Sequence, residues 1–239
     1  MRIFEPSRVS AAGYILVGGA SSRFGKDKAL VEFNGITMIE RMKSLLLAMS
    51  MPEVWLVGDP EKYAVTGISC IPDRFPGEGP LGGILTALCW TEEQERPRMA
   101  LLSSKSAPIP ERNFILSCDM PFLSKEWMEA FLLKSVGREA DVVVPESNFG
   151  LEPLCACWRT AARPLIEEQF KRGVRKVTAV FEHLKTEVLD ESAWKRFDTD
   201  GRLFWNMNTP ADYEEARRVF ETRAGRVDGR TEQSPPLQG

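Results

Sequence analysis

The sequence predicts an α/β fold, a single domain built on a doubly wound, mostly parallel sheet. Short apolar runs of strand length alternate along the chain with longer segments whose apolar residues recur at three- and four-residue spacing. Several of the short runs end in loops rich in glycine or proline. Because such sheets bind ligands beyond the carboxyl ends of their strands, we expect the functional residues in these loops.

The expected strands are short apolar runs, and the first of them, at residues 14–17, ends at Gly18 and Gly19. An Asn-Gly pair at residues 34–35 predicts that a short extended segment reverses direction there. The further strand candidates are residues 54–57, 68–71, 114–116, 141–145 and 154–158.

The expected helices follow these strands. Ser124 can cap one of them, and Thr209 can cap the last, with Pro210 at its first position. The other helix candidates are residues 36–49, 81–88, 160–171 and 177–184.

One hydrophobic core is expected, because the chain has 239 residues of which 43% are hydrophobic. We expect an N-terminal extension at residues 1–11, a catalytic domain at 12–220, and a disordered tail at 221–239, which has almost no large apolar residues. Residues 91–112 are polar and contain three prolines, which predicts a surface insertion.

Charge and composition exclude several function classes. The net charge of -3 gives no general reason to bind nucleic acid or an anionic membrane. No apolar run approaches the roughly 20 residues that cross a bilayer. Five cysteines without a C-x-x-C pair, beside a single histidine, argue against a soft-metal site and for a reducing, cytoplasmic location.

The strongest functional signal is the loop LVGGASSRFGKDK at residues 16–28. Its glycines allow backbone N–H groups to approach phosphate oxygens closely, and Arg23 and Lys28 can neutralise charge that develops on phosphorus. It is not a P-loop, because five residues separate Gly19 from Gly25 and Asp27 stands where Ser or Thr would bind Mg²⁺. The pattern predicts a triphosphate site.

Two further loops follow expected strands. In DRFPGEGPLGGI, residues 73–84, Asp73 can accept hydrogen bonds from a base or ribose, although it could also only cap the turn. In SCDMPFL, residues 117–123, Asp119 is the predicted Mg²⁺ ligand, because Mg²⁺ needs only one or two carboxylates when it bridges phosphates. The alternative is that Asp119 only caps the turn before Pro121.

A fourth motif, FWNMNTPAD at residues 204–212, contains Asn206 and Asn208. Their side chains can donate and accept hydrogen bonds at once, which suits a mixed polar site. The alternative is that this motif only starts the last helix, for which Thr209 and Pro210 already suffice.

Together these motifs resemble those of the molybdenum cofactor guanylyltransferases and related nucleotidyltransferases. Residues 16–28 are similar to the signature L-A-G-G-x-x-x-R-M-G-x-D-K, with Val17 for Ala and Phe24 for Met. The later motifs resemble D…G-P-L-A-G-I, with Gly82 for Ala, then C-D-x-P-F and N-x-N-T-P. The resemblance implies a Rossmann-like nucleotide-diphospho-sugar transferase fold.

The resemblance also implies residue roles. Lys28 would stabilise the α-phosphoryl group, Arg23 would counter the departing pyrophosphate, and Asp119 would hold Mg²⁺. Asn206 and Asn208 would lie near the metal, the phosphates or the pterin. The nucleotide contacts implied by the match are Leu16, Val17, Gly18, Gly19, Arg23, Lys28, Asp73, Gly79, Pro80, Leu81 and Asp119.

The implied reaction transfers GMP from GTP to the terminal phosphate of molybdenum-bound molybdopterin and releases pyrophosphate. Molybdenum cofactor biosynthesis proteins or recipient oxidoreductases would be its partners. The alternatives are a molybdopterin cytidylyltransferase, another small-molecule nucleotidyltransferase, or a non-catalytic protein that binds the nucleotide or the cofactor. Asp27-Lys28 and the loop at residues 79–84 favour GTP, because cytidylyltransferases of this kind tend to have Asn-Lys and a different loop at these places.

Overall fold

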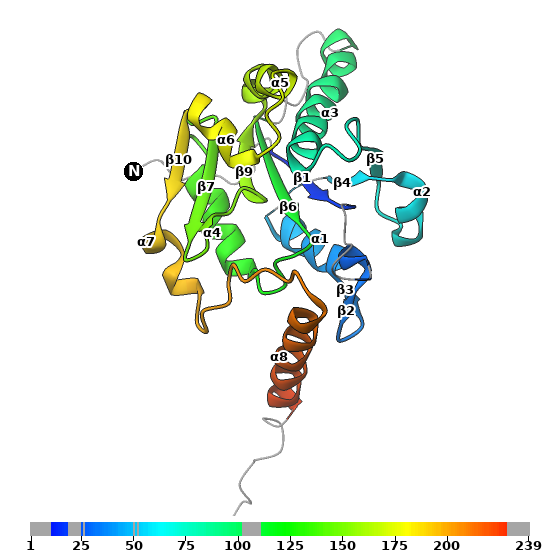
Figure 1. Ribbon diagram of the computed structural model, residues 1–239, viewed down its shortest axis with the longest axis vertical. Coiled ribbons are helices and arrows are strands. Elements are labelled where there is room, and N and C mark those ends of the chain that lie inside the picture. The colour runs from blue at the N-terminus through cyan, green and yellow to red at the C-terminus, as the bar shows by residue number, and fades with distance from the viewer. Residues whose placement is uncertain are drawn as a thin grey trace, which may run out of the picture.

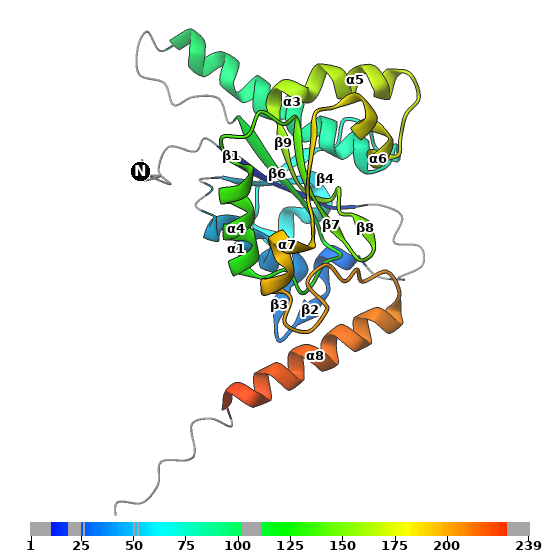
Figure 2. The ribbon, with the colours of Figure 1, turned by 90° about the vertical axis from the view of Figure 1, so that its left-hand side faces the viewer.

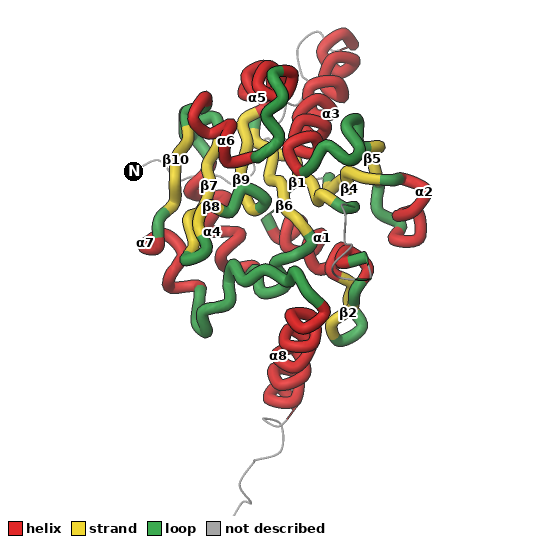
Figure 3. Tube along the Cα trace, viewed as in Figure 1, coloured by secondary structure: helices red, strands yellow, loops and turns green. Residues whose placement is uncertain are grey.

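A mixed sheet with helices on both faces forms the centre of the computed structural model (Figures 1 and 3). The structure describes residues 11–18, 25, 27–49, 51, 53–101 and 111–228, with side chains outside 95–101 and 224–228. The sheet is eight-stranded in the order β10-β7-β9-β6-β1-β4-β5, and β8 pairs with β7. Its strands are β1 (Ala11–Leu16), β4 (Val54–Gly58), β5 (Cys70–Pro72), β6 (Arg112–Ser117), β7 (Val142–Ser147), β8 (Gly150–Leu151), β9 (Cys155–Arg159) and β10 (Thr186–Leu189).

The sheet is mostly parallel. β1 is parallel to both β4 and β6, β4 to β5, and β7 to β10, whereas β9 runs antiparallel to β6 and β7. A separate hairpin joins β2 (Glu32–Phe33) to β3 (Ile36–Thr37). The predicted α/β class with a mostly parallel sheet is confirmed.

Helices cover both faces of the sheet. In Figure 2, α3, α5 and α6 lie on one side of the sheet and α1, α4, α7 and α8 on the other, which is the doubly wound arrangement. The α-helices are α1 (Met38–Ala48), α2 (Pro60–Tyr63), α3 (Pro80–Leu101), α4 (Lys125–Ser135), α5 (Arg163–Lys171), α6 (Val177–Val180), α7 (Glu191–Trp194) and α8 (Pro210–Asp228). Among the described residues, no helix is long and apolar enough to cross a membrane.

The two layers have separate cores because side chains alternate across each strand. In β1, Ile15 packs with the core on the α1 side, while Tyr14 packs with the core on the α3 side. Trp127 of α4 and Ile166 of α5 are fully buried in these two cores, respectively. Each helix therefore buries its apolar stripe against one face of the sheet.

The predicted turns and caps are formed. Asn34 and Gly35 both adopt positive φ, 52° and 76°, as a tight hairpin turn requires. The Ser124 hydroxyl accepts from Trp127 N at 3.2 Å, which caps α4. At α8, Thr209 Oγ1 accepts from Asp212 N and Asp212 Oδ2 accepts from Thr209 N, a reciprocal cap.

The prediction of a surface insertion at residues 91–112 is wrong at both ends of that segment. α3 continues through Leu101, and Arg112 begins β6 with only 2% of its surface exposed. Thr91 is 3% exposed and bonds to Tyr14 and Asn113, each at 2.6 Å. These polar residues are buried because each finds a hydrogen-bond partner inside the fold, a pairing that the local sequence does not show.

Replacing Asn113 by alanine should lower the free energy of unfolding by about 1–3 kcal/mol for each buried polar group that it leaves unpaired. The Asn113 side chain bonds to Thr91 and Thr160 and also donates to Trp158 O, at 3.3 Å. Urea denaturation measures the change. Thr66, whose hydroxyl bonds only locally on the half-buried turn after α2, is the matched control, and an equal loss on Thr66→Ala would contradict the network.

The domain boundaries also differ from the prediction. Ala11, expected in the N-terminal extension, is the first residue of β1 and is buried. α8 runs to Asp228, so the tail expected from residue 221 is helical over 221–228. Arg217 and Glu221 pair at 2.8 Å along this helix and Arg223 pairs with Asp200 at 2.7 Å, so charge pairs take the place of apolar burial. Residues 229–239 lie outside the described residues.

Candidate active site

The predicted loops meet at one edge of the sheet. Leu16 at the end of β1 is in register with Val57 of β4 on one side and with Ser117 of β6 on the other. β5 ends next to β4, where Pro72 is in register with Gly58. Since these four strands are parallel, the loops that follow them open on the same side.

In the first loop, residues 16–28, the structure describes residues 16–18, 25 and 27–28. Gly18 has a φ of +85°, which favours glycine, and Val17 is 7% exposed. A Cβ at Gly58 would come within 2.7 Å of Val17 Cγ2, so the valine packs closely against the next strand. The Val17 side chain is therefore part of the core, and the nucleotide contact predicted for Val17 would involve its backbone. Gly19 and Arg23 lie outside the described residues.

Lys28 begins a short 3₁₀ turn (Lys28–Leu30) that Asp27 caps through a bond from Ala29 N. The other carboxylate oxygen of Asp27 accepts from the Tyr63 hydroxyl at 2.7 Å and pairs with Lys62 at 2.6 Å. Burial alone would raise the pKa of the Asp27 carboxyl, but the bonds from Lys62 and Tyr63 hold it below its usual range. Asp27 therefore anchors the turn that carries Lys28.

The Lys28 ammonium donates to Asn208 Oδ1 at 2.9 Å, across 180 residues of sequence. Next to that asparagine, Met207 N donates to the backbone oxygen of Asp119 at 2.7 Å. The segment at residues 206–208 thus links the first loop to the third. The structure thus brings Lys28, Asp119 and Asn208 to one place, and the roles predicted for them stay predictions.

Asp119 follows β6 and is partly exposed, although protein atoms enclose it closely. Burial raises the pKa of its carboxyl above the ordinary value, while a hydrogen bond from the Ser117 hydroxyl and the positive charge of Lys28 oppose the rise. An enclosed carboxylate beside one lysine favours a further cation, because its negative charge is costly to leave uncompensated.

Asp73 has a structural role in its loop. Its Oδ1 accepts from Phe75 N at 3.0 Å and lies 3.1 Å from the hydroxyl of Thr86 in α3. These hydrogen bonds are the ones expected under the alternative given above, in which Asp73 caps the turn. They tie the end of β5 to α3, and the predicted contact of Asp73 with a nucleotide stays a prediction.

The second loop enters α3 through Gly79, which has a φ of +82°, and an exposed Pro80. Leu81 is fully buried, so the nucleotide contact predicted for it would involve its backbone. A Cβ at Gly82 would lie 2.8 Å from Phe75 Cβ. The departure from the family's alanine at this position therefore accommodates Phe75.

Sequence reasoning missed two polar residues near Asp119. Ser117 donates to the Asp119 carboxylate, and it could have been found as the last residue of the strand that presents the aspartate. Glu152 is 5% exposed; burial raises the pKa of its carboxyl, and the negative charge of Asp119 adds to the rise. It follows β8, a strand that the sequence patterns did not predict, so no signal pointed to it.

The residues around Asp119 fit a magnesium ion. The Asp119 carboxylate and the Ser117 hydroxyl bonded to it are hard oxygen donors of the kind that Mg²⁺ prefers. In the part of the chain that the structure describes, no group of three or more His, Cys, Asp or Glu side chains could hold a metal ion alone. In many Mg²⁺ enzymes nucleotide phosphates and water supply most of the oxygen ligands, so one or two protein carboxylates are enough.

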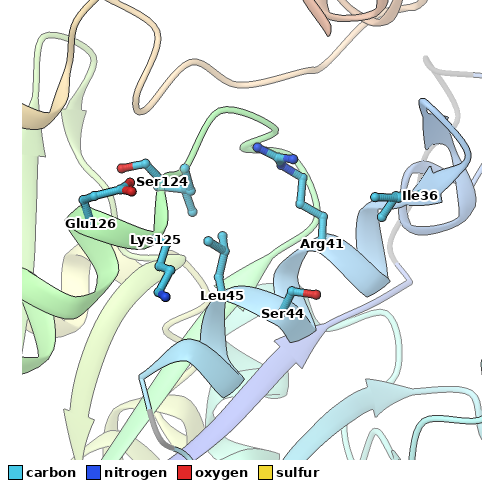
Figure 4. Close-up of a pocket in the computed structure, with 8 residues that line it drawn as sticks. Ile36, Arg41, Ser44, Leu45, Ser124, Lys125 and Glu126 are labelled. Carbon is cyan, nitrogen blue, oxygen red and sulfur yellow. The ribbon is translucent and has the colours of Figure 1, made fainter. Parts of the chain in front are cut away.

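A cavity of about 330 Å³ lies between α1 and α4, and Figure 4 shows it. It is lined by Ile36, Arg41, Ser44, Leu45, Leu123, Ser124, Lys125 and Glu126, and by none of the predicted site residues. Arg41 Nε donates to Pro121 O at 2.6 Å, and its guanidinium lies 4.7 Å from the ring centre of Phe220. This arginine fastens the loop after Asp119 to α1 and α8.

Comparison with known proteins identifies the family of this chain. Residues 13–188 match the model of the MobA-like NTP transferase domain. The probable molybdenum cofactor guanylyltransferase of Carboxydothermus hydrogenoformans is 30% identical over 87% of this chain and 96% of its own length. The probable molybdenum cofactor guanylyltransferase of Pelotomaculum thermopropionicum is 31% identical over 92% of this chain and 98% of its own length.

Solved structures support the fold. The molybdopterin-guanine dinucleotide biosynthesis protein A of Archaeoglobus fulgidus superposes with a TM-score of 0.68 at 24% identity, covering 88% of this chain and 99% of that one. A nucleotidyl transferase from Methanothermobacter superposes with a TM-score of 0.61 at 13% identity, covering 90% of this chain and 99% of that one. At such identities the likeness shows the fold alone. The family model covers most of the sheet and both glycine-rich loops, and the chain belongs to the MobA-like NTP transferase family.

Proposed function

We propose that this protein transfers GMP from GTP to the terminal phosphate of molybdenum-bound molybdopterin. The observation that carries the proposal is the meeting of Lys28 with Asp119 through the segment at residues 206–208. The relatives that are about 30% identical over nearly their whole length are named molybdenum cofactor guanylyltransferases, which supports the same substrates.

The chemistry is a displacement at the α-phosphorus of GTP. A phosphate oxygen of molybdopterin forms the new bond to that phosphorus, and the bond to the bridging oxygen breaks, so pyrophosphate leaves with the electron pair. No general base is needed, because the attacking group is already an anion. Mg²⁺, held by Asp119, would supply positive charge to the phosphate oxygens.

The protein's own residues would position the nucleotide and balance its charge. Lys28, which donates to Asn208, is proposed to stabilise the α-phosphoryl group, and Arg23 is proposed to counter the charge of the leaving pyrophosphate. The backbone of residues 16–19 and the start of α3, with Asp73, are the proposed guanosine and phosphate contacts. The recipient oxidoreductases and the cytoplasmic location stay expectations.

Pyrophosphate release tests the proposal directly. The purified protein is incubated with Mg²⁺ and GTP, CTP or ATP, each with and without molybdenum-bound molybdopterin. We expect release only with GTP and molybdopterin together. Release with CTP in place of GTP would show the cytidylyltransferase, and release with neither would favour a protein that binds without catalysis.

A further inference from the structure

Tyr63 is a fully buried tyrosine that belongs to none of the motifs quoted above. It is the last residue of α2, and its ring lies directly against the end of β4, because a Cβ at Gly58 would come within 3.3 Å of its Cε2. Its backbone N donates to Asp59 O at 3.1 Å, and its backbone oxygen accepts from the Thr66 hydroxyl at 2.8 Å. The position of the ring is therefore set by β4 and α2.

The hydroxyl of Tyr63 lies close to both ends of the glycine-rich loop at residues 16–28. At the end of that loop, the hydroxyl donates to Asp27 Oδ2 at 2.7 Å. Near its start, a Cβ at Gly18 would lie 4.0 Å from the hydroxyl oxygen. The same hydroxyl group therefore lies beside the chain where it leaves β1 and where it enters the 3₁₀ turn.

The hydrogen bond runs from the tyrosine to the aspartate. Burial raises the pKa of the Tyr63 hydroxyl, and the bond to Asp27 and the negative charge of Asp27 raise it further, so the phenol keeps its proton. Lys62 Nζ lies 5.2 Å from the centre of the Tyr63 ring and pairs with the same oxygen of Asp27 at 2.6 Å. The Asp27 carboxylate therefore accepts from a neutral donor and a charged donor at once.

Asp27 connects the tyrosine to Lys28. Its Oδ1 accepts from Ala29 N at 3.0 Å and its backbone oxygen accepts from Leu30 N at 3.1 Å, so it holds the 3₁₀ turn through both side chain and backbone. Lys28 is the first residue of this turn, and its ammonium donates to Asn208 at 2.9 Å. A shift of Asp27 would therefore move the lysine relative to Asn208.

We infer that Tyr63 is a positioning residue for nucleotidyl transfer, whose hydroxyl fixes Asp27 and thereby holds Lys28 where it meets the α-phosphoryl group. This inference rests on the proposed function. A displacement of about 1 Å at a group that contacts the reacting atoms can lower a rate by about 100-fold, even when the changed residue lies far from the chemistry. The alternative is that Tyr63 only fills space beside β4. Removal of the hydroxyl alone separates the two, because phenylalanine keeps the ring.

Steady-state kinetics of Tyr63→Phe test the inference. We expect kcat to fall by about 10–100-fold and the KM for GTP to change by less than about 3-fold, because Lys28 is proposed to act on the transition state. Tyr14→Phe is the matched control, since Tyr14 is also buried and its hydroxyl bonds to Thr91 at 2.6 Å on the other face of the sheet. It should lower the midpoint of urea denaturation and leave both kinetic constants unchanged. A wild-type kcat in Tyr63→Phe, or an equal loss in both variants, would overturn the inference.

A double-mutant cycle shows whether the tyrosine acts through the lysine. If the hydroxyl affects the rate only because it places Lys28, adding Tyr63→Phe to Lys28→Ala should change kcat by less than about 2-fold. Losses that multiply in the double variant would show that Tyr63 affects the rate by another route, and they would overturn the inference.

Amide hydrogen exchange gives a readout that needs no substrate. The amides of Ala29 and Leu30 are bonded to Asp27, so Tyr63→Phe should speed their exchange by about 10-fold in the nucleotide-free protein, as measured by NMR. The amides of β6, in the middle of the sheet, are the reference and should exchange as in wild type. Equal acceleration in both places would show a loss of overall stability alone and would overturn the inference.

If Tyr63→Phe does not fold, Asp27→Ala decides. This variant removes the acceptor of the tyrosine hydroxyl from a half-buried side chain, without a change in the ring. It should lower kcat by about 10–100-fold, and together with Lys28→Ala it should be no slower than Lys28→Ala alone. A wild-type kcat in Asp27→Ala would overturn the inference.

These outcomes separate the inference from the proposed function. If wild type releases no pyrophosphate from any nucleotide with molybdopterin, the proposed function fails, whereas exchange at Ala29 and Leu30 still shows whether Tyr63 holds the turn. If wild type is active and Tyr63→Phe matches it in kcat and in exchange, the positioning role fails alone.

Discussion

Replacing Asp119 by asparagine is expected to reduce GMP transfer by about 10³-fold, the upper range for removing one electrostatic group from an active site. The amide keeps the shape of the side chain and can still bond to the Ser117 hydroxyl, but it lacks the charge that would hold Mg²⁺. Steady-state kinetics over a range of Mg²⁺ concentrations measures the loss. Glu126→Gln, the same charge change on α4 just past this loop, should leave the rate unchanged.

The same substitution should stabilise the metal-free protein, by about 0.5–2 kcal/mol, the range of many single stabilising substitutions. Burial raises the pKa of Asp119 in the folded state, so the unfolded chain ionises more readily than the folded one. This penalty is present above the folded pKa and disappears as the pH falls through it. Thermal unfolding at neutral pH in a chelator should therefore give a higher Tm for Asp119→Asn than for wild type. An active, Mg²⁺-dependent Asp119→Asn variant would contradict the proposed metal site.

Replacing Lys28 by alanine is expected to lower kcat/KM for GTP by about 10²-fold, because the lysine is proposed to meet charge that develops in the transition state. The loss should appear mainly in kcat. Lys43→Ala, which removes a half-buried lysine of α1, is the control. A change in the KM for GTP without a change in kcat would show that Lys28 binds the ground state only.

The Lys28→Ala variant should also have an altered pH profile. The positive charge of Lys28 lowers the pKa of Asp119, against the larger effect of burial. Without it, the carboxylate accepts a proton at higher pH, so the acid limb of kcat/KM should move to higher pH. An unmoved acid limb would show that Asp119 does not control it.

The sequence predicted the places of the loops well, because those places follow from chain direction. Once β1, β4, β5 and β6 are parallel, the residues that follow them must lie at one edge. The asparagine motif was harder to place, because its contact with Lys28 joins positions 180 residues apart. Its residues were predicted from the resemblance and not from the local pattern.

Buried polar residues account for most of what sequence reasoning missed. Thr91, Arg112 and Glu152 are polar and were read as exposed or not noticed, yet each is at most 5% exposed. Arg112 donates to Ala140 O at 2.8 Å, and Thr91 bonds to Tyr14. Their partners come from distant elements, and hydrophobic periodicity carries no information about such pairing.

Residues 208–220, which include the first half of α8, hold Lys28 and the hairpin that follows it in place. These contacts therefore determine the stage of synthesis at which the enzyme can become active. Asn34 of the hairpin after Lys28 donates to Phe220 O at 3.3 Å, the two aromatic rings of Phe33 and Phe220 stack at 4.8 Å, and Lys28 itself is held by Asn208. A growing polypeptide on the ribosome can complete the sheet first, but it cannot hold Lys28 in place until residues 208–220 have emerged. Nucleotide turnover should therefore begin only after residues 208–220 have emerged and have packed against the rest of the domain.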